Sequence, residues 1–241
     1  MNELKIYKNI DSLLLALADR ICEVATVAIA KKDQFNFVLS GGNSPKKLYE
    51  LLASESYKGK INWNKTYFFF GDERFVAVND SQRNSVMVEK ALFEPLNIKE
   101  SHIFKVDTSG SPEEAELNYS DDIQRHFGYK TVQFDFVLLG LGDNSHTASL
   151  FPNSPVLEET KATIKSIFVK DVNMYRITMS APLINQANHI AFLVFGKDKA
   201  DAVYSVVKSV EGSANQYPAR LIKNEKRKIE WFLDSDSASR L

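Results

Sequence analysis

Short apolar runs alternate with helical patterns along most of this chain, and this alternation limits the possible folds more than any other feature. The runs typical of buried strands cover residues 36–40, 66–70, 135–139, 163–169, 190–195 and 228–233. Helical patterns cover residues 12–31, 45–54, 84–93, 113–127 and 197–210. Such alternation is typical of parallel βαβ units with helices on both faces of the sheet. We therefore predict an α/β fold with a mostly parallel sheet.

Composition narrows the class of protein. The chain has 241 residues, of which 44% are hydrophobic and 25% are charged, as in globular proteins. It shows no repeat and no linker-like change in composition, so a single domain over residues 1–241 is the simpler prediction. The net charge of -1 gives no electrostatic reason to expect nucleic acid or an anionic membrane as a partner. The single cysteine, Cys22, excludes an internal disulfide and a cysteine-based metal cluster.

The first residues and the longest apolar segment indicate where in the cell the protein is expected. Residues 1–7 lack the basic segment and apolar core of a signal peptide. The segment 13–30 is apolar but is interrupted by Asp19, Arg20 and Glu23, which favours an amphipathic helix over a membrane span. We therefore expect a cytoplasmic protein.

One histidine follows the carboxyl end of a predicted strand, where α/β proteins commonly have their active sites. The apolar run 134–139 enters the turn Gly140-Leu141-Gly142, and His146 follows among small polar residues. In open sheets of this class, ligands bind beyond the carboxyl ends of the strands. A histidine titrates near neutral pH and can both take and return a proton. His146 is therefore a candidate general base.

Other sites that histidines, serines and glycines often form are missing from the sequence. His102 and His126 stand in polar surroundings and are expected at the surface, and no two histidines have metal-ligand spacing. There is no Gly-x-Ser-x-Gly elbow, which argues against a serine hydrolase. The dinucleotide fingerprint is incomplete, because Ser145 stands at its third glycine. We predict neither a metal nor a cofactor.

A glycine turn follows the first predicted strand of the sheet. Ser40-Gly41-Gly42 is followed by Asn43, Ser44 and Pro45, and then by a helical pattern. Glycines let the backbone approach an anion, and the free amides at a helix start attract negative charge. Ser44 could cap this helix, with Pro45 at its first position. The turn is either a phosphate cradle or an ordinary capped strand-to-helix turn.

Further polar residues follow the other strands. Arg74, after Asp72 and Glu73, could bind a substrate oxygen while either acid holds it, or the three could form a solvated salt bridge. Capping alone accounts for Asn84. Two more cations are candidates, Arg176 and Lys199, and a bound phosphate would offset the unfavourable place of Lys199 in the first turn of a helix. Parallel topology gathers such strand ends on one edge of the sheet.

Taken together, these segments resemble the 6-phosphogluconolactonase family over residues 37–234, nearly the whole chain. The segments that carry the resemblance are Ser40-Gly41-Gly42 with Ser44-Pro45, Gly71-Asp72-Glu73-Arg74, Asn84-Ser85, Gly140-Leu141-Gly142 with the block from His146 to Pro152, Arg176-Ile177-Thr178, Gly196 with Lys199-Ala200, and Trp231-Phe232-Leu233-Asp234. The His146 block is the most specific of them. The resemblance implies a Rossmann-like fold related to the glucosamine-6-phosphate deaminases.

The resemblance also implies roles for particular residues. His146 looks like the catalytic base, and Arg74 looks like a contact near the lactone. The Gly41-Gly42 loop, Arg176 and Lys199 look like the phosphate site. With these we assign substrate binding to the polar side chains of the same segments, which are Ser40, Ser44, Asp72 and Asn84.

The chain departs from the family at one place. The family usually has Asp-Gly directly before the histidine, where this chain has Asn144-Ser145. If the aspartate orients the imidazole in relatives, Asp143 could substitute for it here, or a carbonyl could serve. We assign Asp143, with His146 and Arg74, to the catalytic group on this basis.

The expected activity is hydrolysis of 6-phospho-D-glucono-1,5-lactone to 6-phosphogluconate in the oxidative pentose phosphate pathway, by a monomer or homodimer. A glucosamine-6-phosphate deaminase or sugar-phosphate isomerase is the nearest alternative. The relatives with that activity usually carry an acidic residue shortly after the histidine block, where this chain has Leu150-Phe151-Pro152. A non-catalytic sugar-phosphate sensor is the alternative of another class, because it would not need His146.

Overall fold

The computed structural model describes residues 2–224 and 228–241 and contains two sheets. The strands of the seven-stranded sheet are, in spatial order, β1 (Asn2–Tyr7), β10 (Ile229–Asp234), β9 (His189–Val194), β6 (Phe136–Leu139), β2 (Phe35–Leu39), β3 (Thr66–Phe70) and β5 (Ile103–Phe104). All neighbouring strands in it are parallel. A small antiparallel sheet contains β4 (Asp72–Arg74), β8 (Met174–Met179) and β7 (Ile164–Val169).

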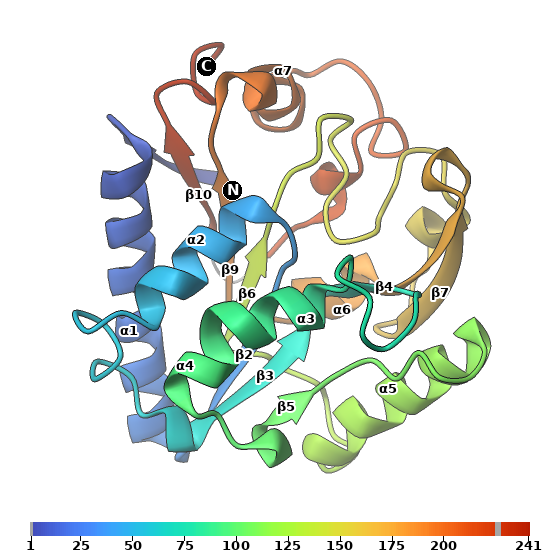
Figure 1. Ribbon diagram of the computed structural model, residues 1–241. Helices are drawn as coiled ribbons and strands as arrows, with labels where there is room; N and C mark the ends of the chain where they lie inside the picture. The colour runs from blue at the N-terminus through green and yellow to red at the C-terminus, as the bar shows by residue number, and fades with distance from the viewer. Residues whose placement is uncertain (1, 225–227) are drawn as a thin grey trace.

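Helices cover both faces of the main sheet (Figure 1). One face packs against α1 (Ile10–Lys32), α2 (Asn43–Leu52) and the helical segment made of α3 (Asn84–Val88), a π-helical turn (Glu89–Phe93) and α4 (Glu94–Leu96). The other face packs against α5 (Pro112–His126), α6 (Ala181–Asn185) and α7 (Ala200–Val203) with its π-helical extension (Tyr204–Lys208). The predicted α/β fold with a mostly parallel sheet is confirmed.

The central strands are apolar on both sides because both sides are covered. Every residue of β2 is buried, and its side chains alternate between the two cores. Phe37 packs toward α1 and α2, where its ring meets that of Phe136 edge-on at a centroid distance of 5.7 Å. Val38 packs toward the opposite core. A strand buried on both faces is expected to be nearly all apolar, and in β2 only Asn36 is polar.

Helix α5 begins at a capping box formed by Ser111 and Glu114. Ser111 Oγ accepts a hydrogen bond from the Glu114 amide at 3.1 Å, and the Glu114 carboxylate accepts one from the Ser111 amide at 2.7 Å. This reciprocal capping box satisfies two amides that a helix start leaves free. The cap therefore fixes where the chain turns from the loop after β5 into the helix.

The small sheet changes the expected position of one predicted site residue. Arg176 does not lie at an end of a main-sheet strand but within β8, opposite Arg74 of β4 in an antiparallel register. The run beginning at residue 163 pairs with β8 as β7 and is not part of the main sheet. Helix α2 also starts earlier than expected, at Asn43. Ser44 is therefore not its cap, and Pro45 is not its first residue.

Neither His102 nor His126 is the exposed surface residue that the sequence suggests. His102 is buried, and the partly buried His126 ring packs among Phe69, Phe104 and Phe127. Its Nε2 lies 2.8 Å from the Asn36 side-chain oxygen. Burial lowers the pKa of His126 from 6.5 to about 4, and Lys32 and His102 act in the same direction.

The low pKa of His126 makes stability depend on pH. Between pH 6.5 and about 4 the unfolded chain binds a proton at this residue and the folded chain does not. The free energy of unfolding is therefore expected to fall as pH falls through this window. Urea unfolding at pH 7 and pH 5 measures the fall, and His126→Phe should make it smaller. An equal fall in both proteins would contradict the assignment.

Candidate active site

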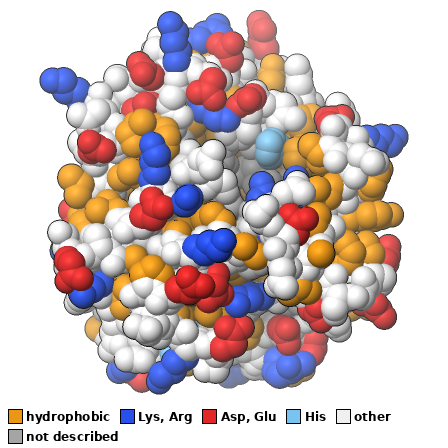
Figure 2. All heavy atoms as spheres, in the orientation of Figure 1, with side chains coloured by type: hydrophobic (Ala, Val, Ile, Leu, Met, Phe, Trp, Pro, Cys, Tyr) orange, Lys and Arg blue, Asp and Glu red, His pale blue; other side chains and the backbone are white. Residues whose placement is uncertain are grey.

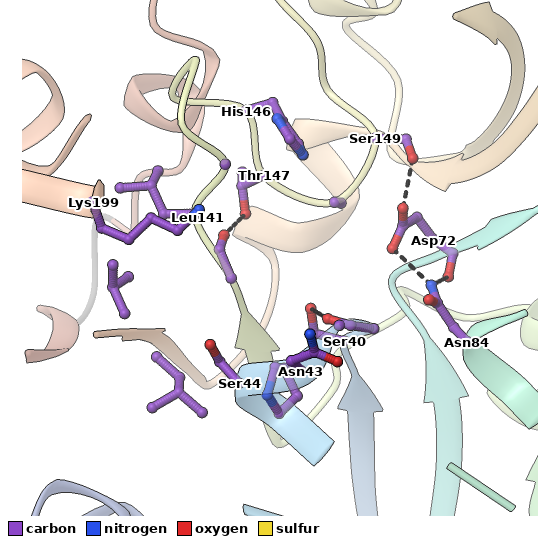
Figure 3. A pocket seen from close by; sticks show the side chains of 18 of the residues that line it. Ser40, Asn43, Ser44, Asp72, Asn84, Leu141, His146, Thr147, Ser149 and Lys199 are labelled. Atoms are coloured by element: carbon purple, nitrogen blue, oxygen red, sulfur yellow. Dashed lines mark hydrogen bonds between the residues drawn. The ribbon is translucent and has the colours of Figure 1, made fainter. Parts of the chain in front are cut away.

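A cavity of about 580 Å³ opens at the carboxyl ends of β2, β6 and β9. Figure 2 shows the hollow in this face of the molecule, with a histidine side chain at its wall. Ten of the residues that the sequence indicates line it: Ser40, Gly41, Gly42, Ser44, Asp72, Arg74, Asn84, His146, Arg176 and Lys199. Figure 3 shows Lys199 and Ser44 on one side of the cavity and Asp72 with Asn84 on the other. The fold therefore brings these predicted residues together.

His146 is held in the wall of this cavity by its neighbours. Its Nδ1 lies 2.6 Å from the side-chain oxygen of Asn144, and its ring stacks on Phe151 at a centroid distance of 4.3 Å. Burial lowers its pKa from 6.5 to about 4. Lys199 and Arg176 lower it as well, while the carboxylates of Asp72 and Asp143 oppose the change. The imidazole is therefore neutral at pH 7 and can accept a proton.

Asp143 does not take the place that we assigned to it. Its exposed carboxylate forms an ion pair with the ammonium group of Lys199 and does not line the cavity. The His146 ring instead contacts the side-chain oxygen of Asn144, a residue to which the sequence analysis gave no role. Adjacent residues of a tight turn point in different directions, and here the first points to a lysine and the second to the imidazole.

The start of α2 forms one wall of the cavity. Gly42 precedes the helix with φ of 100°, a conformation that favours glycine, and no side chain caps the first turn. Gly42, Asn43 and Ser44 all line the cavity. The free amides of a helix start and the positive end of its dipole favour an anion at this position.

The opposite wall is a chain of hydrogen bonds. Ser149 Oγ donates to the Asp72 carboxylate at 2.5 Å, and Asn84 Nδ2 donates to the Asp72 carbonyl at 2.8 Å (Figure 3). The Arg74 guanidinium donates to the Asn84 side-chain oxygen. Gly41 lies against Asn84 so closely that a Cβ on it would meet Asn84 Oδ1 at 1.7 Å. Asp72 and Asn84 therefore fix the position of Arg74 in the cavity.

Two arginines and a lysine line the cavity, together with the carboxylates of Asp72 and Asp198. Arg176 faces Arg74 across the small sheet, and both line the cavity. Burial lowers the pKa of Arg176, and the neighbouring Arg74 acts in the same direction. Among the described residues no group accepts a hydrogen bond from the buried Nε of Arg176. An anion bound between these cations would relieve their repulsion.

Glu73 lies outside the cavity although it stands between two residues that line it. Its buried carboxylate accepts the backbone amides of Asn84 and Ser85 at 2.7 and 2.9 Å, and lies 3.6 Å from Arg83 Nε. It thus holds the start of α3, which carries Asn84 into the cavity. Within the described residues no cluster of three or more potential metal ligands occurs, and no helix is long and apolar enough to cross a bilayer.

The chain is similar to known proteins along nearly its whole length. The family model described as glucosamine-6-phosphate isomerases/6-phosphogluconolactonase matches residues 8–231. A 6-phosphogluconolactonase of Synechocystis is 36% identical over 96% of this chain and 93% of its own length. A probable 6-phosphogluconolactonase 1 of Arabidopsis thaliana is 31% identical over 99% of this chain and 93% of its own length.

Solved structures give the same result. The 6-phosphogluconolactonase from Trypanosoma cruzi superposes with a TM-score of 0.88 at 26% identity, covering 100% of this chain and 97% of that one. The 6-phosphogluconolactonase from Thermotoga maritima gives 0.84 at 26% identity, covering 97% and 100%. This chain therefore belongs to the family of glucosamine-6-phosphate isomerases and 6-phosphogluconolactonases.

Proposed function

We propose that this protein hydrolyses 6-phospho-D-glucono-1,5-lactone to 6-phosphogluconate, as an enzyme of the oxidative pentose phosphate pathway. The observation that carries the proposal is that His146 lies in the wall of a cavity that also holds Arg74, Arg176 and Lys199. An enzyme that hydrolyses a phosphorylated lactone needs a proton carrier beside the lactone carbonyl and cations that bind the phosphate at the other end of the substrate. The names of the similar proteins support the same substrate.

In the proposed reaction, His146 Nε2 takes a proton from water as the water oxygen attacks the lactone carbonyl. Arg74 and backbone amides near the glycine turns stabilise the negative charge on the tetrahedral carbonyl oxygen. The bond from C1 to the ring oxygen then breaks, and His146 returns its proton to that oxygen. A positioned proton carrier contributes about 10²- to 10⁴-fold to the rate.

The phosphate is proposed to lie at the start of α2, between Arg176 and Lys199. Anchoring it there holds the reacting carbonyl against the histidine. Asp143 is then a partner of Lys199 and not of His146, which revises the catalytic role expected for it. The single domain, the cytoplasmic location, the lack of nucleic-acid and membrane partners, and the monomeric or homodimeric state remain predictions from the sequence.

Phe151 favours the lactonase over the deaminase within this family. It lies in the segment where relatives with deaminase activity usually have an acidic residue, and its ring stacks on His146 at 4.3 Å. An apolar ring there cannot supply the additional acid that ring opening of an amino sugar needs. At this position the cavity therefore offers the histidine a hydrophobic support and no acid.

Two substrates separate the candidate functions. The protein is incubated with fresh lactone, with subtraction of spontaneous hydrolysis, and separately with glucosamine 6-phosphate while ammonia is measured. We expect fast loss of lactone and no ammonia. Ammonia release would favour the deaminase, and binding without either reaction would favour the sensor.

Removing either phosphate cation should weaken binding of the phosphorylated substrate. A charge-assisted hydrogen bond contributes about 1.5–3 kcal/mol, so Arg176→Ala and Lys199→Ala should each raise KM by about 10- to 100-fold. Hydrolysis of unphosphorylated gluconolactone should change little. Lys197→Ala is the matched control, since Lys197 is exposed and lies outside the cavity. Equal losses on both substrates would contradict a phosphate-binding role.

A further inference from the structure

The contact between Asn144 and His146 identifies which ring nitrogen carries the proton. Asn144 Oδ1 lies 2.6 Å from His146 Nδ1 and 3.3 Å from the His146 backbone nitrogen. A backbone N–H can only donate, so the atom that faces it is the amide oxygen and not the amide nitrogen. The same oxygen must then accept a hydrogen bond from the ring, which places the proton on Nδ1.

Two other neighbours prevent the ring from turning. A Cβ on Gly142 would lie 2.0 Å from ring atoms of His146, so the ring lies directly against the glycine backbone. Phe151 supports a face of the ring, with an angle of 22° between the two planes. No described residue forms a hydrogen bond with Nε2. That nitrogen is the one left for a substrate or a water molecule.

The backbone keeps Asn144 in this place. The amide of Ser145 donates to the Gly142 carbonyl at 2.8 Å, closing a tight turn that contains Asn144. Ser145 is buried and has a φ of 63°, in the left-handed region, and its carbonyl accepts a hydrogen bond from the Ala219 amide at 3.0 Å. A turn anchored from both sides holds the Asn144 backbone, and its exposed side chain is held by the contact with His146.

We propose that Asn144 is a positioning residue, whose amide oxygen holds the proton on Nδ1 so that Nε2 faces the cavity as the base. Because the Asn144 side chain is uncharged, it gives the protonated imidazole no negative partner beside Nδ1. The role of Asn144 in catalysis rests on the proposed function, but the position of the proton on the His146 ring does not. The charged groups that act on His146 from other elements are Asp72, Arg176 and Lys199, and Asp143 lies in the same turn.

The proposal predicts different effects for two substitutions of Asn144. Asn144→Asp keeps an oxygen against Nδ1 but adds a negative charge beside it, which favours the charged imidazole. The pKa of His146 should rise from about 4 by about one pH unit or more. Asn144→Ala removes the acceptor, so the preference for a proton on Nδ1 should be lost while the ring gains no charged partner.

Nitrogen NMR of the imidazoles tests this without reference to activity. Signals of His146 are assigned by their absence in His146→Asn, and both ring nitrogens are followed with pH in each protein. We expect Nδ1 to carry the proton in the wild-type protein and in Asn144→Asp, and a clearly higher pKa in Asn144→Asp alone. A proton on Nε2 in the wild-type protein at pH 7 would overturn the proposal, whatever reaction the protein catalyses.

Kinetics supply a second readout. Asn144→Ala should lower kcat at pH 7 by about 10- to 100-fold, which is a part of what a positioned proton carrier contributes. Asn144→Asp should keep most of the wild-type kcat, because it keeps an oxygen against Nδ1. The acid limb of kcat/KM, measured with unphosphorylated gluconolactone, should move to higher pH in Asn144→Asp. Asp143→Asn is the matched control and should move the limb much less and in the opposite direction. Equal limbs in the wild-type protein and Asn144→Asp would also overturn the proposal.

Discussion

His146→Asn is expected to lower kcat for lactone hydrolysis by about 10²- to 10⁴-fold, the contribution of a positioned general base. Asparagine keeps a polar side chain at the cavity wall but has no basic nitrogen. The change should leave KM within a few-fold, because the phosphate contacts proposed for Arg176 and Lys199 remain. Initial rates with fresh lactone, corrected for spontaneous hydrolysis, measure the effect.

Thermal unfolding of the same variant serves as its control. His146 lies in a loop, so its replacement should not unfold the protein, and removal of a histidine with a low pKa should lessen the loss of stability in acid. A folded His146→Asn variant with kcat within about ten-fold of the wild-type value would contradict the role of this residue. Another proton carrier, with Asp72 as the first candidate, would then be needed.

Glu73→Ala is expected to lower the free energy of unfolding by about 3–5 kcal/mol, because removing one partner of a buried ion pair leaves the other charge without compensation. The Glu73 and Arg83 side chains are only 1% and 3% exposed, and their charged atoms lie 3.6 Å apart. The substitution also leaves the amides of Asn84 and Ser85 without an acceptor. Urea unfolding at pH 7 measures the change.

A surface ion pair provides the matched control for Glu73. Glu55 is 88% exposed and pairs with Lys58, so Glu55→Ala should change the free energy of unfolding little. In Glu73→Ala the loosened start of α3 should also disturb Asn84 and with it Arg74, so activity should fall even where the protein remains folded. A stability equal to that of Glu55→Ala would show that the buried pair does not hold this segment.

The main sheet could be predicted because its central strands are buried on both faces. Apart from Asn36 in β2 and Thr66 in β3, the residues of these two strands are apolar or aromatic, and a sequence displays such runs directly. Strand β1 lies at the edge of the sheet and is mostly exposed, so no such run marks it. Strand β4 has only three residues and carries charges that a loop could equally carry.

The site residues could be predicted only in part, because the secondary structure of two segments that carry them is not evident from the sequence. Asp72 and Arg74 line the cavity while Glu73 between them is buried, which is the alternation of a strand. Without knowledge that this segment is a strand, the three residues could not be told apart. Asp143 and Asn144 lie in a tight turn, where the directions of side chains follow from backbone angles and not from a repeating pattern. The sequence therefore indicated the turn but not which residue contacts His146.

The orientation of the product in the cavity tests the account most directly. A crystal structure with 6-phosphogluconate should show the phosphate at the start of α2, in contact with Arg176 and Lys199. C1 should lie beside His146, and the hydroxyl formed from the ring oxygen should lie within about 2.6–3.2 Å of His146 Nε2, the reach of a general base. A phosphate bound elsewhere, with C1 turned away from His146, would contradict the proposed function and its mechanism.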